Sequence, residues 1–303
     1  SARGLQAGTA RYRRSLPRSY PLNDWFEETL HPGFHSRLGI ERVLHETKTE
    51  HQHLVIFDNP EFGRVLALDG VVQTTERDEF IYHEMVAHVP ILAHGSAKNV
   101  LIIGGGDGGM LEEVLKHRGI EAAVQVEIDD TVVELSKRYL RAICGNAYED
   151  PRTELVIADG VEFVNQIDRC FDVIIVDSTD PIGPGEVLFG ERFYSGCKSC
   201  LADGGVLVTQ NGVPFLQGEE LTGTLTVFRN LFQSASCYRA GVPAYIGGDM
   251  TFGWGSDNTS LADVDVLALR ARFEAAGIVT EYYTPEMHRG AFALPPYINR
   301  LIK

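Results

Sequence analysis

The chain has 303 residues, of which 44% are hydrophobic, so it can bury the core of one large domain or of two unequal ones. Its 42 acidic side chains exceed its 27 lysines and arginines, and the net charge of -15 disfavours nucleic acid as a partner while suiting solubility or the attraction of a small cation. No apolar run is long enough to cross a bilayer and no signal-peptide pattern occurs, so we expect a cytoplasmic protein without a membrane partner.

Residues 1–22 carry five arginines and no acid, and they lack apolar periodicity. This composition predicts a flexible extension that lies outside the folded domains. A transit-like targeting segment is the alternative interpretation.

Residues 23–94 begin with short strand-like runs at 37–47, 53–57, 64–68 and 71–73. Asp69-Gly70 is typical of a two-residue hairpin turn, so we expect a small antiparallel N-terminal domain followed by a connecting helix from 78 to 92. That helix carries His83-Glu84 and His88, which come near the HExxH zinc motif. Two histidines five positions apart lie about 140° apart around a helix, so they do not face one metal ion.

From residue 95 onward, strands alternate with helices. The strands are predicted at 100–103, 124–128, 155–158, 171–177 and 206–210, and the helices near 110–117, 130–140, 160–168, 188–201 and 217–233. This alternation predicts an α/β domain over residues 95–303 with a doubly wound parallel sheet, whose ligand binds at the carboxyl ends of the strands.

The five cysteines suggest no metal site either. An odd number spread through a long chain suits reduced thiols in the core, and the single C-x-x-C pair, Cys197 and Cys200, has no second pair to complete a zinc site. We therefore expect no metal ion.

The motif GGGDGG at 104–109 joins the first of these strands to a helix, and its glycines let the backbone approach a ligand closely. Glu127 follows about 20 residues later at the next strand end, where an acid binds both hydroxyls of a ribose. Asp107 opposes a phosphate at the helix N-terminus. The pattern therefore predicts a nucleoside with a cationic tail rather than a dinucleotide, although a helix cap is an alternative role for Asp107.

Acids follow four successive strands: Asp107, Glu127, Asp159 and Asp177. Asp177 and Asp180 precede a loop rich in proline and glycine, which suits an acidic floor with a mobile cover. A cap or turn is the alternative for Asp177, and a turn residue before Pro181 is the alternative for Asp180.

Three motifs together resemble those of spermidine synthases, the aminopropyltransferases of polyamine biosynthesis, and most of all the bacterial members. They are LDGVVQTTERDEF at 68–80, GGGDGG at 104–109 and DSTDPIGPG at 177–185. The resemblance implies a Rossmann-like domain of methyltransferase type behind a β-rich N-terminal domain, in a homodimer or homotetramer. It also implies transfer of aminopropyl from decarboxylated S-adenosylmethionine, a cosubstrate and not a tightly bound cofactor, to putrescine, with spermidine and methylthioadenosine as products.

The resemblance also assigns residues. On the donor side it implies that Gln52 contacts the nucleoside, Glu127 the ribose, Asp159 and Gly160 the adenine, Asp107 the aminopropyl ammonium, and that Pro184 belongs to the covering segment. Asp177 is implied as the catalytic acid, and the acceptor is surrounded by Tyr82, His83, Ser178, Thr179, Asp180 and Tyr245. Asp249 departs from the pattern, because we expect a less acidic residue after Gly247-Gly248, and this bears on acceptor length.

The chemistry asks for such residues independently of the family. A sulfonium is already a good leaving group, so the enzyme must supply a neutral amine aligned for in-line attack. Alkylamines have a pKa of about 10.4 and are mostly protonated near neutral pH, so a carboxylate must bind the cation and accept its proton, relay it through water, or mainly orient the amine. Two other classes fit parts of the pattern: a polyamine methyltransferase using S-adenosylmethionine, which typically has no acid at the position of Asp107, and a polyamine-binding protein without turnover.

Overall fold

The computed structural model describes residues 24–179 and 183–303. The flexible extension predicted for 1–22 lies outside the described residues, as does Asp180. None of the helices within those two ranges is both long and apolar enough to span a membrane.

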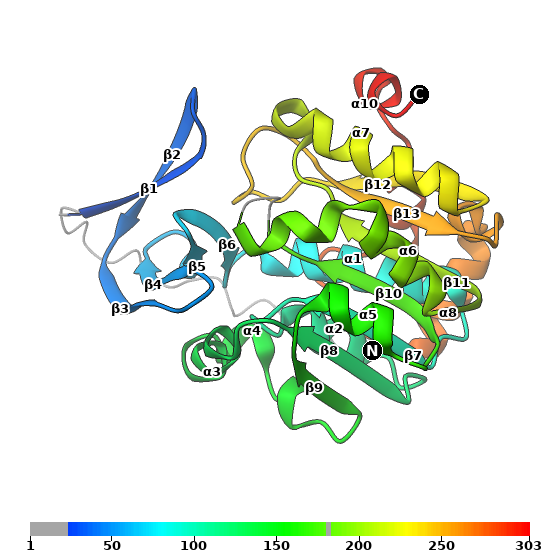
Figure 1. Cartoon of the computed structure of the whole chain (residues 1–303), viewed down its shortest axis with the longest axis horizontal. Coiled ribbons are helices and arrows are strands. Elements are labelled where there is room, and N and C mark those ends of the chain that lie inside the picture. Colours follow the sequence, from blue (N-terminus) through cyan, green and yellow to red (C-terminus); the bar gives the residue numbers. More distant parts are fainter. Residues whose placement is uncertain (1–23, 180–182) are drawn as a thin grey trace, which may run out of the picture.

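The N-terminal part consists of two small antiparallel sheets. The first pairs β1 (Asp24–His31) with β2 (Phe34–Ile40), and the second holds β3 (Arg42–Lys48), β4 (His53–Asn59), β5 (Gly63–Leu68) and β6 (Val71–Thr75). Figure 1 shows the β1–β2 hairpin projecting from the rest of the molecule. The predicted turn at Asp69-Gly70 joins β5 to β6 with φ of 47° and 80°. The predicted run at 37–47 is in fact two strands, and β1 was not predicted.

The second part is built on a seven-stranded sheet whose order is β12-β13-β11-β10-β7-β8-β9. Its strands are β7 (Asn99–Gly104), β8 (Ala122–Glu127), β9 (Thr153–Ile157), β10 (Phe171–Asp177), β11 (Leu201–Gln210), β12 (Ser234–Ala240) and β13 (Met250–Ser256). The first five are mutually parallel, as predicted, while β13 runs antiparallel to β11 and β12 antiparallel to β13. The chain order reverses between β7 and β10, which is where open α/β sheets bind ligands.

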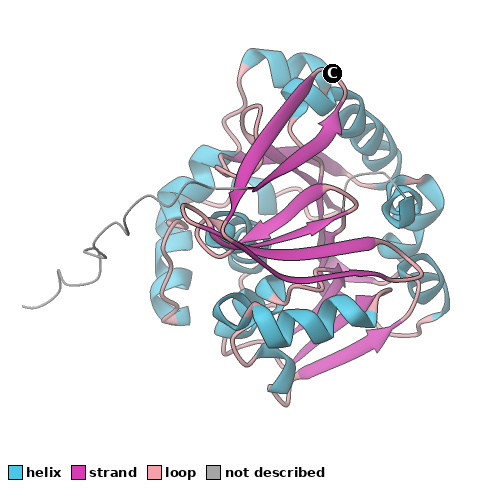
Figure 2. Ribbon diagram, turned by 90° about the vertical axis from the view of Figure 1, so that its left-hand side faces the viewer, coloured by secondary structure: helices cyan, strands magenta, loops and turns pink. Residues whose placement is uncertain are grey.

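Helices cover both faces of this sheet, as Figure 2 shows. They are α1 (Glu79–His94), α2 (Gly109–Lys116), α3 (Asp130–Tyr139), α4 (Arg141–Cys144), α5 (Gly160–Gln166), α6 (Glu191–Ser199), α7 (Pro214–Leu231), α8 (Val266–Ala276), α9 (Pro285–Ala291) and α10 (Pro296–Leu301), with short 3₁₀ helices η1 (Ala147–Glu149), η2 (Gly183–Phe189) and η3 (Leu261–Asp263). Val100 and Ile102 pack with α1 and α2, whereas Leu101 and Ile103 pack with α5, α6 and α7. The alternation of strand side chains therefore divides the core into two layers.

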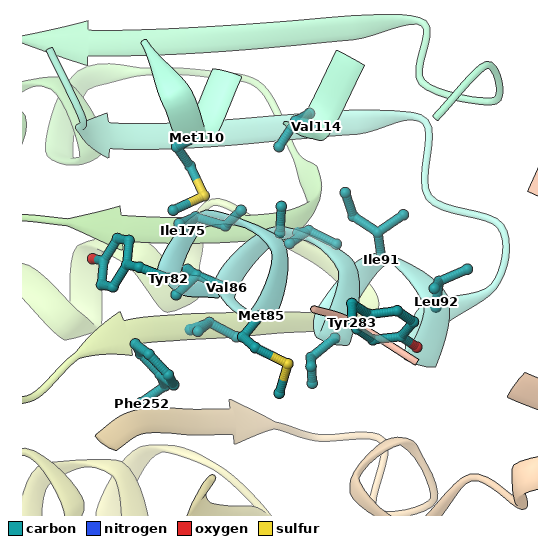
Figure 3. Packing of buried hydrophobic residues seen from close by; sticks show 14 of the residues in the cluster. Tyr82, Met85, Val86, Ile91, Leu92, Met110, Val114, Ile175, Phe252 and Tyr283 are labelled. Carbon is teal, nitrogen blue, oxygen red and sulfur yellow. The ribbon is translucent and has the colours of Figure 1, made fainter. Parts of the chain in front are cut away.

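Helix α1 is buried on all sides, since every residue from Ile81 to Ala93 is buried. Figure 3 shows it packed between Ile175 of β10 and Phe252 of β13. It ends at Gly95 in the left-handed conformation, with φ of 79° and a hydrogen bond to the carbonyl of Ile91. This packing fixes the first turn of α1, which carries Tyr82 and His83, at the carboxyl edge of the sheet. The division at residue 94 stays a prediction.

Candidate active site

A cleft opens at the carboxyl ends of β7, β8 and β10, beneath strands β5 and β6 of the N-terminal part. Its empty volume, including the open mouth, is about 1260 Å³. Among its lining residues are the predicted Gln52, Tyr82, His83, Asp107, Glu127, Asp159, Gly160, Asp177, Ser178, Thr179 and Tyr245. Residues far apart in the sequence thus meet in one cavity that has room for a nucleoside and its tail.

The glycine loop after β7 turns where no side chain fits. Gly104 has φ of 86°, and a Cβ there would collide with the backbone carbonyl of Asp177. The N–H of Gly105 donates to that carbonyl over 2.9 Å, and a Cβ on Gly106 would lie 2.8 Å from Glu127 Oε2. The glycines therefore let β7 and β10 approach each other and leave the carboxylates accessible.

Glu127 ends β8 and is 8% exposed. Its Oε1 accepts from the N–H groups of Ile128 and Asp129 over 2.7 and 3.0 Å. Burial raises the pKa of Glu127 to about 7 despite these two donors. Asp129, the N-cap residue of α3, accepts from Gln52 Nε2 over 3.0 Å, so it holds Gln52, which directly precedes β4, at the cleft.

Asp159 and Gly160 begin α5 at the next edge of the cleft. Asp159 Oδ1 accepts from the N–H groups of Val161 and Glu162 over 2.7 and 3.2 Å, which is a helix N-cap. A Cβ on Gly160 would lie 2.6 Å from Ile103 Cγ2, so only glycine fits here. The backbone of Pro184 belongs to η2, whose Leu188 lines the same side of the cleft.

Asp107 has two partners. Its Oδ1 accepts from the N–H of Gly109 over 2.8 Å, and its Oδ2 lies 3.5 Å from His83 Nε2. The sequence left helix capping as an alternative role; Asp107 does bind the N–H of Gly109, the first residue of α2, although Gly108 is the N-cap residue, and Asp107 also lines the cleft. One carboxylate both anchors the loop and adds negative charge to the cavity.

Asp177 lies at the end of β10 and its Oδ1 accepts from the Tyr82 hydroxyl over 2.6 Å. Burial and then the Asp107 carboxylate raise the pKa of Asp177 to about 6, against the opposing effects of His83 and Tyr82. Burial and the Asp177 carboxylate raise the pKa of Tyr82 well above its ordinary value, so the phenol stays protonated and donates. The pair is suited to hold a cationic amine and to take a proton near neutral pH.

The far end of the cleft is closed by the segment between β12 and β13. The hydroxyl of Tyr245 donates to the carbonyl of Gln73 on β6, and the N–H of Ala244 donates to Asp78 Oδ2 over 2.6 Å. These two contacts tie the segment to β6 and to the start of α1. Asp249, the departure seen in the sequence, is not among the residues that line the cleft and forms an ion pair with Arg239.

Sequence reasoning missed several polar residues of the cleft. Gln73, Gln210 and Gln217 line it, and Glu79 lies behind His83 at 2.6 Å from its Nδ1. Gln73 and Glu79 stand inside the motif at 68–80, which was the signal available for them. Ser178 has a buried hydroxyl that finds no hydrogen-bond partner within the described ranges, which suits a contact to a ligand.

No group of three or more His, Cys, Asp or Glu among the described residues is placed to hold a metal ion. Cys197 and Cys200 are both buried and free, whereas Cys170 is exposed.

Comparison with known proteins places this cleft in a family. The model of the spermine/spermidine synthase domain matches residues 79–265, and that of the spermidine synthase tetramerisation domain matches residues 24–76. The chain belongs to the spermine/spermidine synthase family. The family resemblance inferred from the sequence is confirmed, and the chain is accordingly a polyamine aminopropyltransferase.

The family's bacterial relatives match almost throughout. The polyamine aminopropyltransferase 1 of Pseudomonas aeruginosa is 57% identical over 277 residues, covering 91% of this chain and 97% of that protein. The polyamine aminopropyltransferase of Ruegeria sp. is 56% identical and covers 91% and 98%.

Solved structures of spermidine synthases have the same fold as this chain. A spermidine synthase in complex with the transition-state analogue AdoDATO has a TM-score of 0.89 at 36% identity, covering 96% of this chain and 98% of that one. The spermidine synthase from Thermotoga maritima has a TM-score of 0.86 at 33% identity, covering 96% and 97%. The predicted fold class is confirmed.

Proposed function

We propose that this aminopropyltransferase takes its aminopropyl group from decarboxylated S-adenosylmethionine and transfers it to putrescine, giving spermidine and methylthioadenosine. The observation that carries the proposal is the pair of carboxylates at the tail end of the cleft. Asp107 and Asp177 both line it, and the second is bound by Tyr82. Two acids suit one cation from each substrate.

Residues at the other end of the cleft support the proposal for the donor. Glu127 Oε2 lies beside the glycine loop, where a carboxylate can accept hydrogen bonds from a ribose diol. Asp159 and Gly160 line the cleft together with the apolar side chains of Ile128 and Leu188, and this environment suits adenine. Asp107 then meets the aminopropyl ammonium. A solved neighbour of the fold binds the analogue AdoDATO, which accords with this class of donor.

The chemical step is a substitution. The lone pair of the acceptor nitrogen attacks the aminopropyl carbon bound to sulfur, and the C–S bond breaks with its electron pair moving to sulfur. The sulfonium becomes a neutral thioether, and one proton leaves the nitrogen. Asp177 is the catalytic residue that receives or orients this proton, because its raised pKa brings it nearer to neutral pH than an ordinary aspartate.

The acceptor is surrounded by Tyr82, Ser178, Thr179, Tyr245 and Gln73. Asp180 belongs to the same proposed set, although it lies outside the described residues. The ion pair of Asp249 with Arg239 removes it from this end. The acceptor site is therefore closed by amides and phenols, which suits the second amine of a short diamine.

Two further parts belong to the proposal. The match of residues 24–76 to a tetramerisation domain supports a homo-oligomer, for which we propose a homodimer or homotetramer. A cytoplasmic location also stays a prediction.

Product analysis by mass spectrometry tests the proposal. A panel of diamines and triamines is incubated with either decarboxylated or ordinary S-adenosylmethionine. We expect spermidine from putrescine and the decarboxylated donor. Methylated amines from ordinary S-adenosylmethionine would point instead to the methyltransferase, and no product from either donor would point to a binding protein.

A further inference from the structure

His83 is a buried imidazole with a carboxylate at each ring nitrogen. Its side chain is 2% exposed, its Nδ1 lies 2.6 Å from Glu79 Oε2, and its Nε2 lies 3.5 Å from Asp107 Oδ2. Asp107 belongs to the cleft, whereas Glu79, with 15% of its side chain exposed, stands behind the ring in the first turn of α1. Glu79 has no role in the steps described above.

The geometry constrains the number of protons. An ionised carboxylate only accepts hydrogen bonds, and a neutral imidazole has only one N–H, so Glu79, His83 and Asp107 together must hold two protons to satisfy both contacts. Burial raises the pKa of Glu79 and by itself would lower that of His83. The carboxylates of Asp107 and Glu79 outweigh burial and raise the pKa of His83 well above its ordinary value, so both protons lie on the ring.

Among residues 24–179 and 183–303, the charged groups shown to interact with this ring come from several elements packed around it, and they are acids. They are Asp78 and Glu79 at the start of α1, Asp107 in the glycine loop, Glu112 and Glu113 on α2, and Asp177 at the end of β10. An imidazolium at this position relieves their mutual repulsion, while Lys116 on α2 pairs with Glu112 and Glu113.

We propose that Glu79 is a positioning residue that holds His83 as an imidazolium, and that this internal cation keeps Asp177 ionised and ready for the amine. The inference rests on the role proposed for Asp177 above. His83 lowers the pKa of Asp177 against burial and Asp107, so loss of its charge leaves Asp177 protonated to higher pH. A protonated Asp177 neither attracts the cationic acceptor nor takes its proton.

The charge on His83 is measured without turnover. Histidine ring nitrogens of the 15N-labelled, empty enzyme are observed by NMR at pH 7.5, and His83→Asn identifies the signal. We expect an imidazolium in the wild type and in Glu79→Asp, which keeps the carboxylate. Glu79→Gln keeps the shape and a carbonyl acceptor but removes the charge, and we expect a neutral ring.

The consequence for Asp177 is measured as kcat/KM against pH. If loss of the cation raises the pKa of Asp177 from about 6 by roughly one unit, Glu79→Gln loses about threefold more activity at pH 6.5 than at pH 8.5. Dividing by the wild-type value at each pH cancels the titration of the free amine. Glu112→Gln is the matched control, because it removes a carboxylate that lies 3.1 Å from Lys116, and we expect its ratio to follow the wild type.

The outcomes are separable. A neutral His83 in the wild type, or an imidazolium that persists in Glu79→Gln, overturns the inference, and so does an unchanged pH ratio in Glu79→Gln. Should the wild type transfer no aminopropyl group, the proposed function fails while the NMR measurement still decides the charge of His83.

Discussion

The carboxylate of Asp107 is expected to select the donor, and Asp107→Asn isolates this effect. Ordinary and decarboxylated S-adenosylmethionine differ only by one carboxylate on the tail. In this variant the amide oxygen can still accept from the N–H of Gly109, so the loop keeps its 2.8 Å cap while the site loses a negative charge. The substitution therefore separates the two roles that the structure combines in one side chain.

The size of the effect follows from the surroundings. With 11% of its side chain exposed, Asp107 lies in a partly solvated cleft. A donor carboxylate brought within about 4 Å would be repelled by roughly 4 kcal/mol at an effective dielectric of 20, which is an upper value of about three decades in affinity. Water and rotation of the tail reduce this figure.

Calorimetric titration of both donors into wild type and Asp107→Asn, without acceptor, measures the preference directly. We expect the preference for the decarboxylated donor to shrink at least tenfold in the variant. Methylthioadenosine, which lacks the aminopropyl tail, serves as the control and should bind both proteins alike. An equal loss for both donors would refute selection by charge and assign Asp107 to the loop alone.

Three further substitutions test the site. Asp177→Asn should lower turnover by about 10² or more with little change in donor affinity, and near-normal turnover would remove Asp177 from its role. Glu127→Gln should stabilise the ligand-free protein above pH 7 and weaken donor binding. The pKa of the Glu127 carboxyl rises from 4.5 to about 7 on folding, so its ionisation lowers the free energy of unfolding by up to roughly 3 kcal/mol as the pH rises across that window. An unchanged melting temperature at pH 8 would contradict the burial argument. Gly104→Ala should lower the free energy of unfolding by about 2–4 kcal/mol, measured by thermal unfolding, because the residue has a φ of 86° and its Cβ would collide with a backbone carbonyl. Gly223→Ala on α7 is the control, since a Cβ there meets nothing within 4 Å.

The parallel sheet and the acids at its strand ends could be predicted because both follow from the same pattern of apolar runs in the sequence. A strand buried on both faces reads as a continuous apolar run, and the residue that follows it lies at the sheet edge. Asp107, Glu127, Asp159 and Asp177 satisfy this rule, so their meeting in one cleft followed from topology alone.

Two kinds of strand escaped prediction. β1 (Asp24–His31) is half exposed and rich in acids, so it lacks the alternation of a strand with one buried face. β12 and β13 form an antiparallel pair at the sheet edge, and the expectation of alternating strands and helices stopped short of them. Their connecting segment nevertheless places Tyr245, because Tyr245 binds Gln73, 172 residues away, and Ala244 binds Asp78, 166 residues away.

The pairing of charged side chains within the site could not be predicted from the sequence for another reason. Asp249 and Glu79 look alike in the sequence, as acids beside motif residues. The first is paired with Arg239 outside the cleft, and the second lies 2.6 Å from a ring nitrogen of His83. Only three-dimensional neighbours decide which acid is neutralised, because the pairing depends on packing and not on spacing along the chain.

These neighbours also explain why the cleft suits cations and not merely nucleosides. Burial raises the pKa of both Glu127 and Asp177 toward neutral pH, so each holds a proton more readily than an exposed acid does. A sulfonium, an ammonium or a diamine entering the cleft brings positive charge close to these groups and lowers their pKa again. Because binding and proton affinity are linked reciprocally, the same event that fills the site drives its carboxyls toward the ionised form. In the proposed mechanism, substrate binding thus completes the base that the next step of the reaction requires.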